Sequence, residues 1–205
     1  QIGRAAAMVL IGSSTEKPTV VIGKDTRLSS DMLEGALIAG LCSVGANVMS
    51  LGVVPTPAVA LLTKKYKANA GIMISASHNP FEFNGIKIFS STGYKLPDTM
   101  EERIEAIVLD GAEPYPVVED EKLGCVIKAD NATEDYIDHV KNTVAYTLEG
   151  MNVALDCSNG SASATAEKLF TELGATCHMM FDKPNGININ KNCGSTHISA
   201  LGEYV

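Results

Sequence analysis

The fold is decided by the stretch AGIMISASHNP (Ala70–Pro80), in which an apolar run passes directly into a polar elbow. The apolar half predicts a buried strand. Pro80 fixes the elbow, because the residue before a proline is displaced from the helical region. The turn NGIK (Asn84–Lys87) then predicts a second apolar strand. The segment therefore holds the Ser77 hydroxyl at a strand end, with an imidazole beside it and a lysine one turn later.

Upstream of this stretch, predicted strands and helices alternate at short spacing. We expect strands at 19–22 and 47–52 and helices at 31–44 and 57–66. Asp31, with Glu34 three residues later, predicts a capping box at the start of the first helix, and Gly45 predicts its end. Such alternation is typical of an α/β layer with helices covering a sheet.

Downstream, the pattern predicts that the sheet is mixed and that a second unit follows. Residues 85–90 and 93–96 are expected to form a hairpin, and 97–109 a helix. The polar stretch 117–130 is expected to be irregular and to end a first domain, 1–130. A helix at 133–148, strands at 151–156 and 175–181, and a helix at 161–173 predict a second domain, 131–205. The expected fold class is thus α/β, with mixed sheets layered with helices in two consecutive domains, both incomplete.

Composition excludes several classes of protein. The chain has 205 residues, a formal net charge of −8 and no apolar run of the ~20 residues that a membrane-spanning helix needs. Lysines and arginines are scattered, which argues against nucleic-acid binding. The five cysteines lack CxxC spacing and predict reduced thiols in a cytoplasmic protein. Gln1 is neither a start methionine nor part of a signal-peptide pattern, which predicts a start inside a longer sequence.

Two interpretations of Ser77 remain open on spacing alone. A serine at a strand end commonly caps a helix or satisfies a turn. The neighbouring His78 and Lys87 favour a reactive group instead. His78 is suited to bind a substrate hydroxyl or orient a phosphate, and Lys87 to act as a base if its pKa is lowered. Neither a Gly-x-Ser-x-Gly elbow nor a P-loop is present.

The strand, elbow and turn together closely resemble the phosphoserine loop of the α-D-phosphohexomutase superfamily. The sequence SASHNPF is similar to that of the branch that acts on glucosamine phosphates. The mannose and glucose branches typically have Thr-Gly or Thr-Ala before Ser-His-Asn-Pro. The resemblance spans nearly the whole chain and extends to four further stretches: GKDTRLSS (23–30), PTPAVA (55–60), DCSNG (156–160) and NINKNCGSTH (188–197).

This resemblance implies a reaction and a set of residues. A phosphorylated Ser77 would interconvert glucosamine 6-phosphate and glucosamine 1-phosphate through a 1,6-bisphosphate, in the route to UDP-N-acetylglucosamine. His78 and Lys87 become acid–base or phosphate-orienting candidates, and Arg27 a phosphate-binding one. The other interpretation of Arg27 is an ion pair with Asp25 or Asp31. A mutase for mannose or glucose phosphates, and a catalytically silent sugar-phosphate-binding scaffold, remain alternatives.

The resemblance also implies what lies outside this sequence. Magnesium would bind Ser77 through its phosphate, but the three carboxylates that complete the family's metal site are expected beyond Val205. The family's N-terminal arginine loop and its third and fourth domains are likewise absent. We therefore expect negligible activity from these 205 residues alone. A homodimer is a further expectation.

Overall fold

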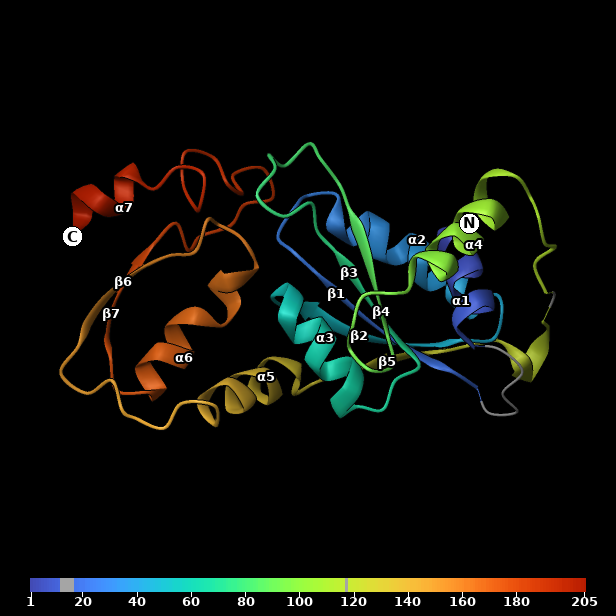
Figure 1. The fold of residues 1–205 in the computed structure, drawn as a ribbon, viewed down its shortest axis with the longest axis horizontal. Coiled ribbons are helices and arrows are strands. Elements are labelled where there is room, and N and C mark those ends of the chain that lie inside the picture. The colour runs from blue at the N-terminus through green and yellow to red at the C-terminus, as the bar shows by residue number, and fades with distance from the viewer. Residues whose placement is uncertain (12–16, 117) are drawn as a thin grey trace.

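The computed structural model describes residues 1–11, 17–116 and 118–205, which form a larger first unit and a smaller second unit (Figure 1). The first unit comprises α1 (Ile2–Ile11), β1 (Thr19–Lys24), α2 (Ser30–Cys42), β2 (Asn47–Val53), α3 (Thr56–Lys65), β3 (Ala70–Ile74), β4 (Ile86–Ser90), α4 (Asp98–Leu109), the 3₁₀ turn η1 (Asp120–Lys122) and β5 (Val126–Lys128). The second comprises α5 (Ala132–Lys141), β6 (Asn152–Asp156), the 3₁₀ turn η2 (Ser161–Ala164), α6 (Ala166–Glu172), β7 (Thr176–Met180) and α7 (Ser199–Tyr204).

The sheet of the first unit has five strands in the order β4-β3-β1-β2-β5. Strand β1 pairs in parallel with β2 and β3, whereas β4 runs antiparallel to β3. The prediction of a mixed α/β fold is therefore confirmed. The predicted hairpin is only partly present, because its second arm contributes a single bridge between Phe89 and Lys95. Pro97 follows that bridge and α4 begins at Asp98, so the chain leaves the sheet.

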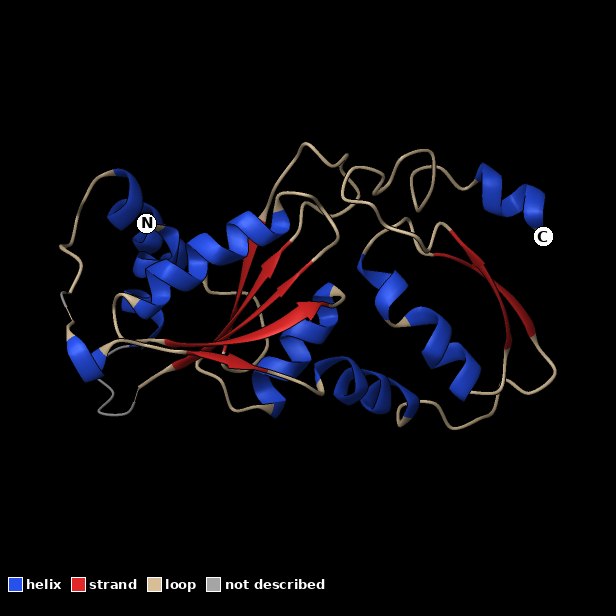
Figure 2. Ribbon diagram, turned by 180° about the vertical axis from the view of Figure 1, so that it is seen from behind, coloured by secondary structure: helices blue, strands red, loops and turns tan. Residues whose placement is uncertain are grey.

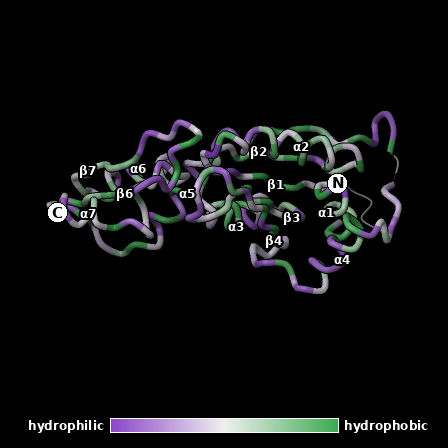
Figure 3. Tube along the Cα trace, turned by 90° about the horizontal axis from the view of Figure 1, so that it is seen from above, coloured by the Kyte–Doolittle hydropathy of each residue, from purple (hydrophilic) through white to green (hydrophobic). Residues whose placement is uncertain are grey.

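Helices cover both faces of this sheet (Figure 2). Val20 and Ile22 of β1 pack with α1 and α2, while Val21, between them, packs with α3. This alternation follows from the two-residue period of a strand. Figure 3 shows the hydrophobic residues along β1 in the interior and hydrophilic residues in the outer loops. A third hydrophobic cluster joins α1 to α4. Because helices lie on both faces of the sheet, the first unit is a three-layer α/β/α structure.

The start of α2 corrects one sequence prediction. Its N-cap is Ser29, and no capping box forms around Asp31 and Glu34. Both carboxylates instead accept hydrogen bonds from the Lys24 ammonium, each at 2.5 Å, and Glu34 accepts a second from Ser50 Oγ at 2.7 Å. The opposite charge of Lys24 competes successfully for both groups. Burial alone would lower the Lys24 pKa, but the hydrogen bonds to Asp31 and Glu34 raise it above its usual value.

Two further predictions are wrong at the link between the units. The stretch 117–130 is not wholly irregular, because β5 lies within it and pairs in parallel with β2 over three residues. Residue 117 itself lies outside the described residues. The helix predicted for 133–148 ends at Lys141, so Val144 is exposed. Residues 142–147 are exposed and Leu148 is only partly buried, so the apolar spacing beyond Lys141 does not mark a buried helix face.

The second unit is a two-stranded parallel sheet with helices beside it. The helix predicted for 161–173 is divided into η2 and α6 at Thr165, whose φ of −133° lies outside the helical range. Gly174, with φ of +99°, ends α6 as predicted. Helix α7 was not anticipated from the sequence.

Candidate functional site

Ser77 lies in the loop between β3 and β4, at the carboxyl end of β3. Its backbone has φ of +57°, a left-handed conformation that costs a non-glycine residue roughly 1–3 kcal/mol unless its surroundings enforce it. The chain changes here from wholly buried β3 to exposed Ser77 and His78. The Ser77 N–H donates to Ser75 Oγ at 3.1 Å. The loop therefore presents the serine hydroxyl to solvent.

The base of the loop is closed by an exceptionally near approach of two backbone segments. The Ser75 N–H donates to Gly85 O at 2.9 Å. A Cβ added to Gly85 would lie 2.6 Å from Ser75 O, closer than a real Cβ contact allows. The glycine of the Asn-Gly-Ile-Lys turn is thus required by packing.

Arg27 holds the same loop from within the protein. Its side chain is 1% exposed and forms an ion pair with Asp25, whose side chain is 2% exposed. Its Nη2 donates to Asn79 O at 2.6 Å and to Ser77 O at 3.3 Å. Asp25 also accepts a hydrogen bond from Ser30 Oγ. Of the two interpretations drawn from the sequence, the structure shows the pair with Asp25, and Arg27 reaches Ser77 through its backbone carbonyl.

Lys87 approaches the loop from β4. Its Nζ donates to Ser75 O at 2.8 Å. Burial lowers the pKa of Lys87, Arg27 lowers it further, and the Asp25 carboxylate partly opposes both effects. A lowered pKa makes the amine easier to deprotonate, which suits a proton acceptor. The structure therefore brings Lys87, Arg27 and the Ser77 loop together, with His78 exposed beside the serine.

The second unit contributes a residue that the sequence interpretation missed. Asn190 donates from Nδ2 to both Ser77 O and Asn79 O, each at 3.0 Å. Figure 1 shows the loop that follows β3 beside the loop that follows β7. The resemblance included residues 188–197, but nothing in the sequence indicated that this loop touches the serine loop.

Two more hydrogen bonds join the units near the same place. Thr26 Oγ1 donates to Asn159 O at 2.6 Å, and the Leu28 N–H donates to Gly186 O at 2.8 Å. Gly186 has φ of +92°, and a Cβ there would lie 3.3 Å from the Leu28 side chain. Backbone groups of the second unit thus lie directly against the 25–28 loop.

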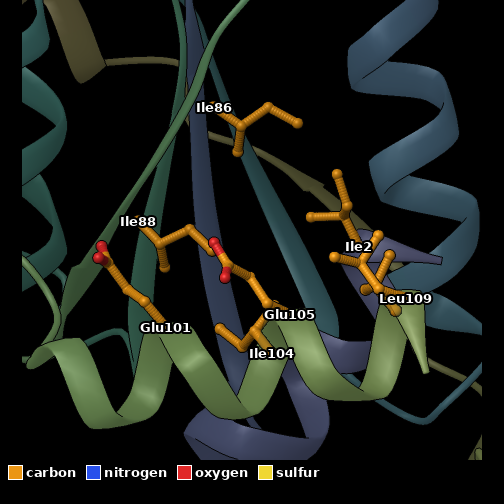
Figure 4. A pocket seen from close by; sticks show the side chains of 8 residues that line it. Ile2, Ile86, Ile88, Glu101, Ile104, Glu105 and Leu109 are labelled. Atoms are coloured by element: carbon orange, nitrogen blue, oxygen red, sulfur yellow. The ribbon is translucent and has the colours of Figure 1, made fainter. Parts of the chain in front are cut away.

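A hollow of about 530 Å³ lies elsewhere in the first unit (Figure 4). Ile86 and Ile88 of β4 face α4, which contributes Ile104 and Glu105. The lining is mostly apolar and includes no residue of the Ser77 loop. Over the described ranges, no three His, Cys, Asp or Glu side chains are grouped as a metal site would need. No helix in the part of the chain that the structure describes is long and apolar enough to cross a membrane.

Comparison with known proteins identifies the family of this chain. Residues 1–114 match the family model described as phosphoglucomutase/phosphomannomutase, alpha/beta/alpha domain I. The chain belongs to this family. The solved structure of a phosphoglucomutase/phosphomannomutase family protein from Burkholderia thailandensis superposes with a TM-score of 0.74 at 25% identity, over 90% of this chain and 40% of that one. The resemblance inferred from the loop motifs is therefore confirmed.

Curated relatives in this family extend the similarity over all 205 residues. The chain is 50% identical to the phosphoglucosamine mutase of Acetivibrio thermocellus and 52% identical to that of Clostridium acetobutylicum. It covers 46% of each of these relatives, so it spans about half the length of the curated proteins it matches.

Proposed function

We propose that the complete protein carrying this chain is a phosphoglucosamine mutase, which interconverts glucosamine 6-phosphate and glucosamine 1-phosphate. The observation that carries the proposal is the exposed, left-handed Ser77, whose loop is held by Arg27, Lys87 and Asn190. Identity of 50% or more to phosphoglucosamine mutases supports the choice of sugar.

Ser77 would act as the phosphoryl carrier. In the phosphorylated form, the bond between Oγ and phosphorus breaks as a sugar hydroxyl forms a new bond to phosphorus and loses its proton. The resulting 1,6-bisphosphate then returns its other phosphoryl group to Oγ. Phosphoryl transfer depends mainly on positioning and on neutralising charge. Lys87 would accept or return the hydroxyl proton, and His78 would orient a phosphate oxygen.

Magnesium would supply further charge neutralisation in such a site. It prefers an octahedral set of oxygen ligands. The described residues do not provide that set, since they contain no grouped carboxylates near Ser77. Asp25, the acidic residue closest to the loop in the hydrogen-bond network, is already committed to Arg27 and Ser30. We derive no step through the metal from this chain, and its binding through a Ser77 phosphate stays part of the proposal.

We place the domain boundary at 130/131, because β5 ends at Lys128 and α5 begins at Ala132. The proposed setting is the cytoplasm, with a hexosamine phosphate as substrate and a homodimer as the assembly. The prediction that these 205 residues alone show negligible turnover also stands.

The decisive experiment is intact-mass measurement of the complete protein after incubation with glucosamine 1,6-bisphosphate. We expect one phosphoryl adduct, lost in Ser77→Ala and retained in Ser91→Ala, because Ser91 is an exposed serine of the turn after β4. Absence of any adduct would favour the silent scaffold.

Steady-state assays with glucosamine, glucose and mannose phosphates test the substrate. We expect the highest kcat/KM with glucosamine phosphate. A preference for mannose phosphate would overturn the choice of sugar while leaving the phosphoserine chemistry intact.

A further inference from the structure

The carbonyl oxygens of Ser77 and Asn79 each receive two donors. Arg27 of the first unit supplies one nitrogen to both, and Asn190 of the second unit supplies another to both. A carbonyl oxygen has two lone pairs and an amide nitrogen has two N–H groups. The arrangement thus uses both N–H groups of Asn190 Nδ2 and both lone pairs of each carbonyl oxygen.

The two donors are not equivalent at Ser77. Arg27 lies 3.3 Å from Ser77 O but 2.6 Å from Asn79 O, so its stronger bond is to Asn79. Asn190 lies 3.0 Å from Ser77 O and makes the shorter bond there. The Ser77 residue is exposed, so the hydrogen bonds to its backbone carbonyl and from its N–H to Ser75 Oγ are the described polar contacts of its left-handed backbone.

Asn190 is itself held rigidly by the second unit. It has φ of +58°, which asparagine tolerates better than most residues, and its N–H donates to Ser158 O at 2.8 Å. Farther along the same loop, the Gly194 N–H donates to Asp156 Oδ2 at 2.7 Å. Hydrogen bonds within the second unit therefore fix the backbone that carries the Asn190 amide.

We propose that Asn190 is a positioning residue for Ser77, through which the second unit holds the serine backbone in the conformation that presents its hydroxyl. The inference rests on the proposed phosphoryl-carrier role of Ser77. It adds that the carrier loop is completed only by docking of the second unit, so that the serine geometry depends on a residue 113 positions away in sequence.

The test is Asn190→Gly in the complete protein, because glycine keeps the left-handed φ and removes only the amide. Asn192→Gly is the matched control, since Asn192 has φ of +56° and an exposed side chain in the same loop. Misplacement of a reacting group by about 1 Å typically costs on the order of 100-fold in rate. We therefore expect kcat to fall roughly 10- to 100-fold in Asn190→Gly, with KM within about twofold of the unaltered protein and no change in Asn192→Gly.

Asn190→Asp is a second variant that preserves shape. Its carboxylate would face two carbonyl oxygens and repel them, so kcat should fall at least as far as in Asn190→Gly. Amide hydrogen exchange over residues 76–79 supplies a readout independent of activity, and we expect about tenfold faster exchange in both Asn190 variants but not in Asn192→Gly.

Unchanged kcat and unchanged exchange in a folded Asn190→Gly would overturn the inference, as would equal losses in Asn190→Gly and Asn192→Gly. If the unaltered protein accepts no phosphoryl group, the proposed function fails, but the exchange measurement still decides whether Asn190 positions the loop. A Ser77 adduct with normal kcat in both Asn190 variants keeps the function and discards the role of Asn190.

Discussion

The two units meet at two places that differ in chemistry. The loop junction consists of residues 25–28 and 77–79 against 159 and 186–190, and it is joined by hydrogen bonds that mostly end on backbone carbonyls. The helix junction consists of α3 against α5. There Asp135 accepts hydrogen bonds from Lys65 Nζ at 2.8 Å and Tyr66 Oη at 2.5 Å, beside buried Ala132.

This difference in chemistry implies that the two junctions have different functions. The helix junction combines apolar packing around Ala132, which is not directional, with two hydrogen bonds to Asp135, and none of these contacts involves the serine loop. Hydrogen bonds to specific carbonyls are directional, so the loop junction fixes the serine loop. We infer that substitutions in the loop junction alter chemistry most, and that those in the helix junction alter stability slightly.

The largest expected effect is on turnover in Lys87→Met, because Lys87 supports the base of the serine loop next to the loop junction; Lys65→Met is its counterpart at the helix junction. Methionine keeps much of the length and removes the amine, so the bond to Ser75 O and the proton acceptor are lost together. Loss of a general acid–base group typically costs about 10²- to 10⁴-fold in kcat. Steady-state assay of the complete protein should show that loss in Lys87→Met and less than about a twofold change in Lys65→Met.

Equal losses of kcat in Lys87→Met and Lys65→Met would contradict the inference that the loop junction affects chemistry more than the helix junction does. The pH profile adds a second check. Because burial lowers the Lys87 pKa, a rate limited by its free amine should rise with pH, and the midpoint of that rise should lie below the ordinary lysine pKa of about 10.4. The rise should be absent from the residual activity of Lys87→Met.

The next largest effect is on stability in Arg27→Met. It would leave the Asp25 carboxylate, 2% exposed, without its ion-pair partner. Removing one member of a buried pair typically costs about 3–5 kcal/mol in the free energy of unfolding. Urea denaturation should show this loss, and the double variant Arg27→Met/Asp25→Leu should recover part of it, since no buried charge remains unpaired. A loss below about 1 kcal/mol would place Arg27 among ordinary surface ion pairs.

Sequence reasoning predicted the elements of the first sheet well, because β1 and β3 are continuous apolar runs with turn residues at their ends. It failed for β5, which has only three residues, all exposed, and is too short to show a period. At the site, Ser77 and Lys87 stood out because they flank the turn that follows β3, whereas Arg27, which follows β1, was named through the family resemblance of residues 23–30. Asn190 did not, since its role arises from contact between distant loops and no local spacing encodes that contact.

The smallest expected effect is at the helix junction, in Asp135→Asn. Hydrogen bonds from Lys65 and then Tyr66 hold the Asp135 pKa below its usual range. A carboxyl whose folded pKa is depressed adds stability above its unfolded pKa of about 3.9, and that stability is lost as pH falls through the lower folded value. Because the Lys65 side chain is 44% exposed, solvent screens the pair.

We therefore expect Asp135→Asn to reduce the free energy of unfolding by about 1 kcal/mol or less near pH 7. The difference in free energy of unfolding between the unaltered protein and Asp135→Asn should become smaller below about pH 4, where the Asp135 carboxyl begins to protonate. Urea denaturation across that pH range measures both values, with kcat of the complete protein assayed in parallel. A large loss of kcat in Asp135→Asn would show that the helix junction, like the loop junction, sets the position of Ser77.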